Sequence, residues 1–150
     1  MSSVRQLCTF FLDDLYFGVE VQKVQEVLLY QEMTRVPLAP PDVRGLINLR
    51  GQIVTAIDLR RRFDMPALPA GRRPMNVVIR TADGPVSMLV DEIGDVLEVD
   101  TDSYEHPPEI LRGAARELIQ GAYKLDGRLL LMLNSDRAAS VTATHSVCVV

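Results

Sequence analysis

The sequence predicts a mostly β domain made of small barrels, with a few short helices. Eight or more short apolar segments follow one another along the 150 residues. Nine glycines and nine prolines, many of them in turn signals, separate these segments. Closure of such short strands into barrels is expected because it leaves no strand edge without a hydrogen-bonding partner.

The N-terminal part begins with a predicted hairpin. The apolar segments 7–12 and 15–21 flank Asp13 and Asp14, which are typical turn residues. Beyond this hairpin, valines and a leucine recur at helical spacing in V-Q-K-V-Q-E-V-L-L. This spacing predicts a short helix over 21–29.

A loop, two strands and a helix are predicted next. The proline-rich segment 35–41 is expected to be a loop or a sheet edge, because proline fixes φ and donates no backbone N–H. The apolar segments 45–49 and 53–57 are expected to be strands. Asp58 can cap a short helix over 59–63 because its carboxylate accepts the first N–H groups of that helix.

The second half of the sequence continues in the same way after an exposed linker at 66–74, which is expected to separate two halves of the strand set. Its predicted elements are strands over 76–80, 86–90 and 93–99, a short helix or exposed loop over 109–118, a hairpin around Asp126-Gly127, and a last helix capped by Asn134 or Ser135. The final residues, from about 141 to 150, fit either a disordered tail or an additional edge strand.

Charge and composition exclude several classes of protein. The net charge of −4 divides into +3 for residues 1–80 and −7 for residues 81–150. A nucleic-acid-binding protein would need a concentrated basic face, and the run Arg60-Arg61-Arg62 is predicted to be a solvated helix end instead. No apolar stretch approaches the roughly 18 residues of a membrane helix, and no signal segment begins the chain. We therefore expect a cytoplasmic protein without direct membrane insertion.

The sequence contains no pattern typical of catalysis, metal binding or cofactor binding. It lacks the nucleophile elbow, the phosphate-binding loop, the dinucleotide fingerprint and the zinc-protease motif. His106 and His145 have no metal-ligand spacing. Adjacent carboxylates such as Asp91 and Glu92 would face opposite sides of a strand and could not act as a pair. We therefore expect no enzyme, no metal and no cofactor.

Arg50 stands between two apolar segments in G-L-I-N-L-R-G-Q-I. A guanidinium there can keep its stem on apolar surface while its head reaches a carboxylate or backbone carbonyls. The pattern leaves a solvated turn and a protein contact equally open. Glu26, offset from Val24 and Val27 on the predicted helix, is likewise open between a solvated helix face and a functional contact.

Five segments together resemble the CheW-like domains. The resemblance rests on V-Q-K-V-Q-E-V-L at 21–28, T-R-V-P-L-A-P at 34–40, N-L-R-G followed by I-V-T-A-I-D-L-R at 48–60, M-L-V-D-E-I-G-D-V-L-E-V at 88–99, and Q-G-A-Y-K-L-D-G-R-L-L-L-M-L at 120–133. The segments occur in the order of the family and cover about residues 7–137. Thr55-Ala56 departs from the family, which often has proline there.

This resemblance implies a fold of two five-stranded barrels packed together as one CheW-like domain over 1–150. It also implies a non-enzymatic adaptor that links the cytoplasmic tips of chemoreceptors to a CheA-type histidine kinase in membrane-tethered arrays. The residues carried over from the family to a receptor- or partner-binding surface are Arg50, Glu26, Val24, Ile53 and Asn48.

Two other functions stay open from the sequence. An adaptor of a non-flagellar chemosensory system, controlling pili, surface sensing or a second messenger, would carry the same motifs. A small-ligand-binding β-barrel would share the fold but would need a built cavity.

Overall fold

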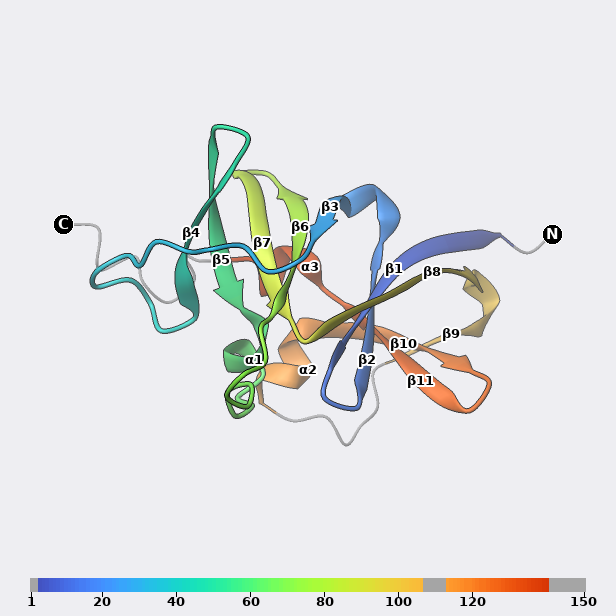
Figure 1. The fold of residues 1–150 in the computed structure, drawn as a ribbon. Coiled ribbons are helices and arrows are strands. Elements are labelled where there is room, and N and C mark those ends of the chain that lie inside the picture. The colour runs from blue at the N-terminus through green and yellow to red at the C-terminus, as the bar shows by residue number, and fades with distance from the viewer. Residues whose placement is uncertain (1–2, 107–112, 141–150) are drawn as a thin grey trace.

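Two β-sheets make up the fold of this computed structural model, which describes residues 3–106 and 113–140. The chain starts in a six-stranded sheet, crosses to a five-stranded sheet, and returns to the first sheet for its last strands (Figure 1). The first crossing runs through η1 (Val21–Lys23), and the second consists of Asp91 alone, between β7 (Gly84–Val90) and β8 (Glu92–Asp100). Each crossing is therefore short enough to keep the two sheets close together.

The six-stranded sheet has the strand order β8-β1-β2-β11-β10-β9. Its strands are β1 (Val4–Leu12), β2 (Leu15–Glu20), β8 (Glu92–Asp100), β9 (Tyr104–Glu105), β10 (Ile119–Leu125) and β11 (Arg128–Leu133). All neighbouring strands are antiparallel except β11 and β2.

The five-stranded sheet has the order β3-β6-β7-β5-β4, with one parallel pair, β5 and β7. Its strands are β3 (Val24–Leu28), β4 (Val43–Leu49), β5 (Gln52–Asp58), β6 (Met75–Thr81) and β7 (Gly84–Val90). The helical segments of the chain are η1 (Val21–Lys23), α1 (Leu59–Arg62), η2 (Thr101–Ser103), α2 (Ala114–Leu118) and α3 (Ser135–Ala138).

The predicted mostly β fold of two packed subdomains with few short helices is confirmed, but the expected closed barrels are wrong. Among the described strands, β8 and β9 stay edges of one sheet and β3 and β4 stay edges of the other. The edge strand β8 carries four exposed carboxylates, and such charges disfavour further strand pairing. An isolated antiparallel bridge joins Thr34, in the segment between β3 and β4, to Leu46 of β4.

The predicted helix over 21–29 is also wrong. Only Val21–Lys23 forms a 3₁₀ turn, and Val24–Leu28 is the strand β3, which pairs with β6. A β-bulge lies between Val24 and Glu26 in this pairing. The apolar spacing of this short segment fits a helix, but its valines fit a strand equally well, and the cross-strand partner decides between them.

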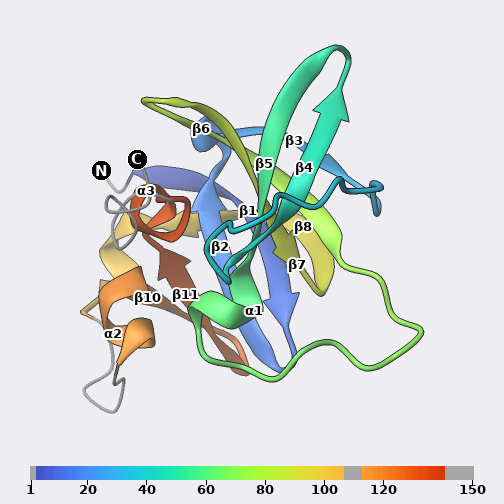
Figure 2. The same cartoon turned by 90° about the vertical axis from the view of Figure 1, so that its left-hand side faces the viewer.

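Most turn and cap predictions are confirmed. The hairpins β1–β2 and β10–β11 form as predicted, Asp58 caps α1, and Asn134 caps α3. The other expected strands pair as the hairpins β4–β5 and β6–β7. The linker 66–74 has no regular structure, yet it joins α1 to β6 within one sheet instead of separating two halves of the strand set (Figure 2). The tail at 141–150 lies outside the described residues, as does the first part of the segment 109–118.

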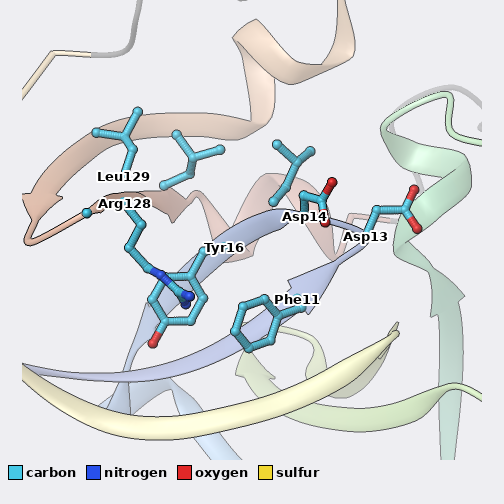
Figure 3. A pocket seen from close by; sticks show the side chains of 9 residues that line it. Phe11, Asp13, Asp14, Tyr16, Arg128 and Leu129 are labelled. Atoms are coloured by element: carbon cyan, nitrogen blue, oxygen red, sulfur yellow. The ribbon is translucent and has the colours of Figure 1, made fainter.

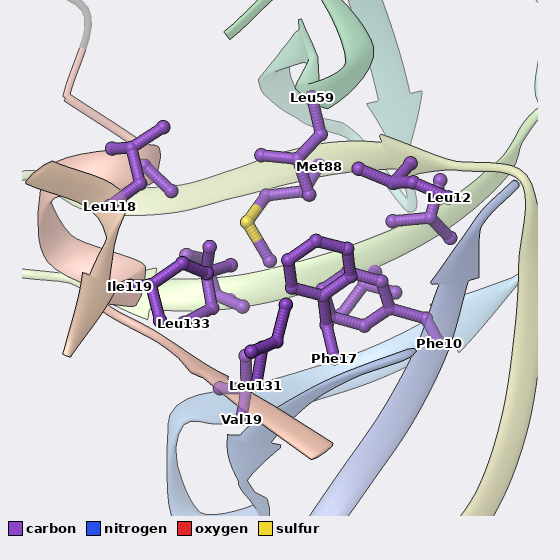
Figure 4. Close-up of a cluster of buried hydrophobic side chains, with 14 of the residues drawn as sticks. Phe10, Leu12, Phe17, Val19, Leu59, Met88, Leu118, Ile119, Leu131 and Leu133 are labelled. Carbon is purple, nitrogen blue, oxygen red and sulfur yellow. The ribbon is translucent and has the colours of Figure 1, made fainter. Parts of the chain in front are cut away.

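One hydrophobic core joins the two sheets. Phe10 and Phe17 of the six-stranded sheet stack with ring centroids 5.5 Å apart, and Met88 of the five-stranded sheet lies in the same buried cluster (Figure 4). Leu59 of α1 and Leu118 of α2 complete this cluster at its ends. Because both sheets bury side chains in the same cluster, separating them would expose large apolar surface.

A buried arginine ties the sheets together beside this core. Arg60 of α1, whose side chain is 5% exposed, donates to both carboxylate oxygens of Asp91, at 2.7 and 2.6 Å. It also pairs with Asp13 in the β1–β2 turn and donates to the carbonyl of Pro66 at 2.6 Å. The prediction that Arg60 is solvated is therefore wrong. We call Arg60, Asp13 and Asp91 the Arg60 cluster.

Within the Arg60 cluster, the contact between Arg60 and Asp91 favours the charged form of both groups. Hydrogen bonding to Asp91 raises the pKa of Arg60 further above its ordinary value, against the effect of burial. Burial alone would raise the pKa of Asp91, but the hydrogen bonds from Arg60 and from the Asp13 N–H outweigh burial and lower it. Satisfied hydrogen bonds of this kind are what a buried ion pair needs to be tolerated.

Replacing Arg60 by Met should lower the free energy of unfolding by about 3–5 kcal/mol, because Asp91 would remain as a buried carboxylate without its cation. Urea unfolding measures this loss. Arg61→Met is the matched control, since Arg61 is exposed on the same helix, and should change stability by less than about 0.5 kcal/mol. Equal losses of unfolding free energy in the two variants would show that the ion pairs of Arg60 do not stabilise the contact between the sheets.

The lowered pKa of Asp91 predicts a pH dependence of stability. As the pH falls, Asp91 of the unfolded chain is protonated near the ordinary carboxyl pKa of about 3.9, at a higher pH than Asp91 of the folded protein. The contribution of Asp91 is therefore complete above that value and is lost as the pH falls through the folded pKa. Asp91→Asn should make the fall in unfolding free energy below about pH 4 shallower. A fall as steep as in the wild type would contradict this assignment.

Candidate functional site

Arg50 and Gly51 form the two-residue turn of the β4–β5 hairpin. Their φ values are +51° and +88°. Two central residues with positive φ match a type I′ turn, which fits the twist of the flanking strands. Gly51 suits this conformation and Arg50 does so at some cost, because its Cβ crowds the backbone at positive φ.

Asn48 stabilises this turn from the preceding strand. Its side-chain oxygen accepts a hydrogen bond from the backbone N–H of Gly51 at 2.9 Å. Asn48 is also the direct cross-strand partner of Ile53, and both side chains are exposed. The N-L-R-G motif is therefore explained locally as a turn with its own side-chain cap.

Arg50 forms an ion pair with Glu26 on β3. Because β3 and β4 are the two opposite edges of the five-stranded sheet, this pair spans the gap that a closed barrel would have filled with backbone hydrogen bonds. The Arg50 side chain is 72% exposed and that of Glu26 is 18% exposed. An ion pair this open to water contributes at most about 1 kcal/mol, so it orients the guanidinium more than it stabilises the fold.

The other predicted site residues lie near this pair in different environments. Ile53 is 60% exposed on β5, two residues beyond Gly51 and opposite Asn48, and offers apolar surface near the turn. Val24 lies two residues before Glu26 on β3, but it is half-buried and packs against the core shared by the two sheets. The structure thus brings Arg50, Glu26, Asn48 and Ile53 together at the surface and places Val24 partly beneath it.

Away from this surface, a hollow of about 450 Å³ lies at the turns of the β1–β2 and β10–β11 hairpins (Figure 3). The Arg128 guanidinium lies 4.8 Å from the centre of the Tyr16 ring, in cation–π contact. Asp13 points away from Arg128 toward α1, where it belongs to the Arg60 cluster. The charged groups of Arg128 and Asp13 thus have partners within the protein, and they do not converge on one point.

The remaining site chemistry is sparse in the described part of the chain. No group of three or more His, Cys, Asp or Glu side chains is arranged to hold a metal ion there. No helix among those residues has the length and apolar character needed to cross a membrane. Cys8 is half-buried, and burial raises the pKa of its thiol.

Sequence reasoning missed two features of this region. It missed the Arg60 cluster, although the pattern D-L-R at 58–60 and the position of Asp91 between two apolar strands were available as signals. It also placed Glu26 on a helix, whereas on β3 the bulge lets Val24 pair with Ile79 and Glu26 with Val78, so the two side chains follow neighbours on opposite faces of β6.

Comparisons with known proteins agree with this fold. The CheW-like domain family matches residues 6–142. A probable chemotaxis protein CheW of Rhizobium etli is 30% identical over 95% of this chain and 92% of its own, and the chemotaxis protein CheW of Treponema pallidum is 29% identical over 86% and 78%. The crystal structure of the scaffolding protein TtCheW from Thermoanaerobacter tengcongensis superimposes with a TM-score of 0.82 at 24% identity, covering 91% of this chain and 92% of that one.

Two packed β-sheets of this topology define the class of fold that the chain shares with the solved scaffolding protein. This chain belongs to the CheW-like domain family. The sequence resemblance is thereby confirmed at the level of the family and of its chemotaxis role.

Arg50→Asn should leave the free energy of unfolding within about 1 kcal/mol of the wild type. Asparagine tolerates positive φ better than arginine, and this gain offsets the loss of an exposed ion pair. Gly51→Ala should cost about 1–2 kcal/mol for conformational reasons alone, because no atom lies within 4 Å of the added Cβ. Urea unfolding of the two variants checks both values. A loss above about 2 kcal/mol in Arg50→Asn would mark Arg50 as an internal anchor.

Proposed function

We propose that this chain is a non-enzymatic adaptor that binds the cytoplasmic tips of chemoreceptors and a CheA-type histidine kinase, and that the surface around Arg50 meets the receptor. The partners follow from the family to which the chain belongs. Its place in the cell follows from the same reasoning: the cytoplasmic side of a receptor array, held there by its partners.

The observation that carries the proposal is the orientation of Arg50. A guanidinium that is 72% exposed is held by Glu26 at the tip of a hairpin, and the exposed apolar side chain of Ile53 lies two residues beyond Gly51 on β5. A receptor tip is a helical hairpin, and a charged rim beside apolar surface suits recognition of a helix. Because the turn is already ordered, little conformational entropy is lost when a partner binds.

Reconstitution of the protein with receptor signalling domains and the kinase should raise kinase autophosphorylation and bring it under ligand control. Arg50→Glu should weaken receptor binding by about tenfold or more, because a like charge would face Glu26 and the partner would meet the wrong sign. Circular dichroism and the melting temperature should stay close to those of the wild type. No stimulation by folded wild-type protein would contradict the adaptor function.

A charge swap separates the two roles open to Arg50. In the double variant Arg50→Glu with Glu26→Arg, the intramolecular pair can form again with its charges reversed. If Arg50 contacts the receptor, binding stays weak in the double variant. If Arg50 serves only to hold the hairpin tip in place, binding returns, and the direct contact proposed for Arg50 is wrong.

A further inference from the structure

The segment that joins β3 to β4 is hydrogen-bonded to the five-stranded sheet at two points before its tip. The carbonyl of Leu29 accepts a hydrogen bond from the side chain of buried Asn76 at 3.1 Å. Thr34 and Leu46 exchange two backbone hydrogen bonds, of 2.9 and 2.8 Å. Gly45 permits this close approach, since an added Cβ would lie 2.7 Å from the Thr34 carbonyl oxygen. The tip of the segment is therefore presented on a rigid base.

Leu38 stands at this tip in a conformation that leucine rarely adopts. Its φ is +63°, and its side chain is 98% exposed. A bulky residue in the left-handed region is unfavourable relative to asparagine or glycine, and full exposure of an apolar side chain adds nothing to folding. Backbone outliers of this kind are most common at functional sites, and here the fold supplies no reason for leucine.

A groove of about 980 Å³ lies beside Leu38. Its lining includes the apolar side chains of Met33, Val36, Leu38 and Met65. It also includes three arginines, Arg35, Arg44 and Arg61. The groove thus combines apolar contact area with donors that match carboxylates in geometry and charge.

The charge of this groove is not balanced by the protein itself. Asp58 is the one acidic side chain in its lining; it is 7% exposed, accepts from Arg44 at 3.2 Å, and caps α1. Arg35 and Arg61 are exposed and form no ion pair with any residue that the structure describes. The Arg73 guanidinium adds a further positive charge at the rim, 4.9 Å from the centre of the Tyr30 ring.

The groove is separate from the surface around Arg50. Arg44 lies at the start of β4 and Arg50 follows its end, so the two sites occupy opposite ends of one hairpin. Six residues of strand place them about 20 Å apart. One partner could therefore occupy the hairpin tip while another occupies the groove.

We propose that the groove between the 35–41 loop and α1 is a second protein-binding site, which takes an amphipathic segment of a different protein with carboxylates beside apolar side chains. Carboxylates of that segment pair with Arg35 and Arg61, and its apolar side chains cover Leu38 and Val36. The site is independent of the receptor contact proposed for Arg50.

Site-specific photo-crosslinking in the native host tests this site. The full-length chain carries benzoylphenylalanine at position 38, and mass spectrometry identifies the crosslinked peptide. The control places the crosslinker at position 96, where Val96 is 59% exposed on the opposite sheet. The crosslinked segment is then synthesised as a peptide, and its affinity for the purified protein is measured by calorimetry at low and high salt.

We expect a crosslinked segment with carboxylates beside apolar residues, formed from position 38 and not from position 96. Its affinity should fall about tenfold or more in Arg35→Glu with Arg61→Glu, and also with rising salt. Arg116→Glu, a reversal of an exposed arginine on α2, should leave it unchanged. Leu38→Asn should weaken binding while the melting temperature stays equal or rises, which separates a binding role from a folding role.

Three crosslinking results would overturn the proposal: a crosslinked segment without carboxylates, a crosslink to a second copy of this chain, or no crosslink at all. A peptide whose affinity does not change when Arg35 and Arg61 are replaced would overturn it as well. Arg50→Glu should leave the crosslink at position 38 intact. Loss of receptor coupling and loss of the groove partner are therefore distinguishable failures.

Discussion

The relative placement of the two sheets depends on one buried guanidinium. Arg60 belongs to the five-stranded half of the chain, yet it binds Asp13 in the β1–β2 turn of the other sheet and Asp91 at the single-residue crossing between β7 and β8. Hydrophobic burial brings the sheets together without specifying direction, whereas these charge-assisted hydrogen bonds have a fixed geometry. The cluster therefore sets the orientation in which the shared core around Phe10, Phe17 and Met88 packs.

That orientation leaves the five-stranded sheet open along β3 and β4, and both of the proposed binding surfaces lie beside this sheet's edges. The Arg50–Glu26 pair spans this opening at one end of the β4–β5 hairpin, and the loop with Leu38 projects at the other end. Both features place an arginine or leucine at positive φ on a well-ordered base. Turns of this kind lose little entropy on binding, which suits a protein whose role is to hold partners in fixed positions.

The distribution of charge follows the same division. Arginines gather on the five-stranded half, around the groove and the hairpin tip, while carboxylates line the edge strand β8 of the other sheet. On β8 the carboxylates protect an open edge from pairing with another chain. In the groove the arginines outnumber their acidic partners within the protein. The net charge of −4 therefore combines an acidic strand edge on β8 with a basic groove on the other half of the molecule.

Turns, caps and strand segments were determined by the sequence itself. Asp13-Asp14, Asp126-Gly127, Asp58 and Asn134 act through local geometry that needs only their immediate neighbours, and the family motifs followed from residue order. The tertiary structure alone decided the features that depend on partners distant in the chain. Residues 24–28 form a strand because β6 lies beside them. The sheets stay open because their edge strands carry charge or are joined by side chains. Arg60 is buried because Asp13 and Asp91 both lie within reach of its guanidinium. The local spacing of residues in the sequence carries no information about pairing energies between residues tens of positions apart. These features could therefore be recognised only in the folded chain.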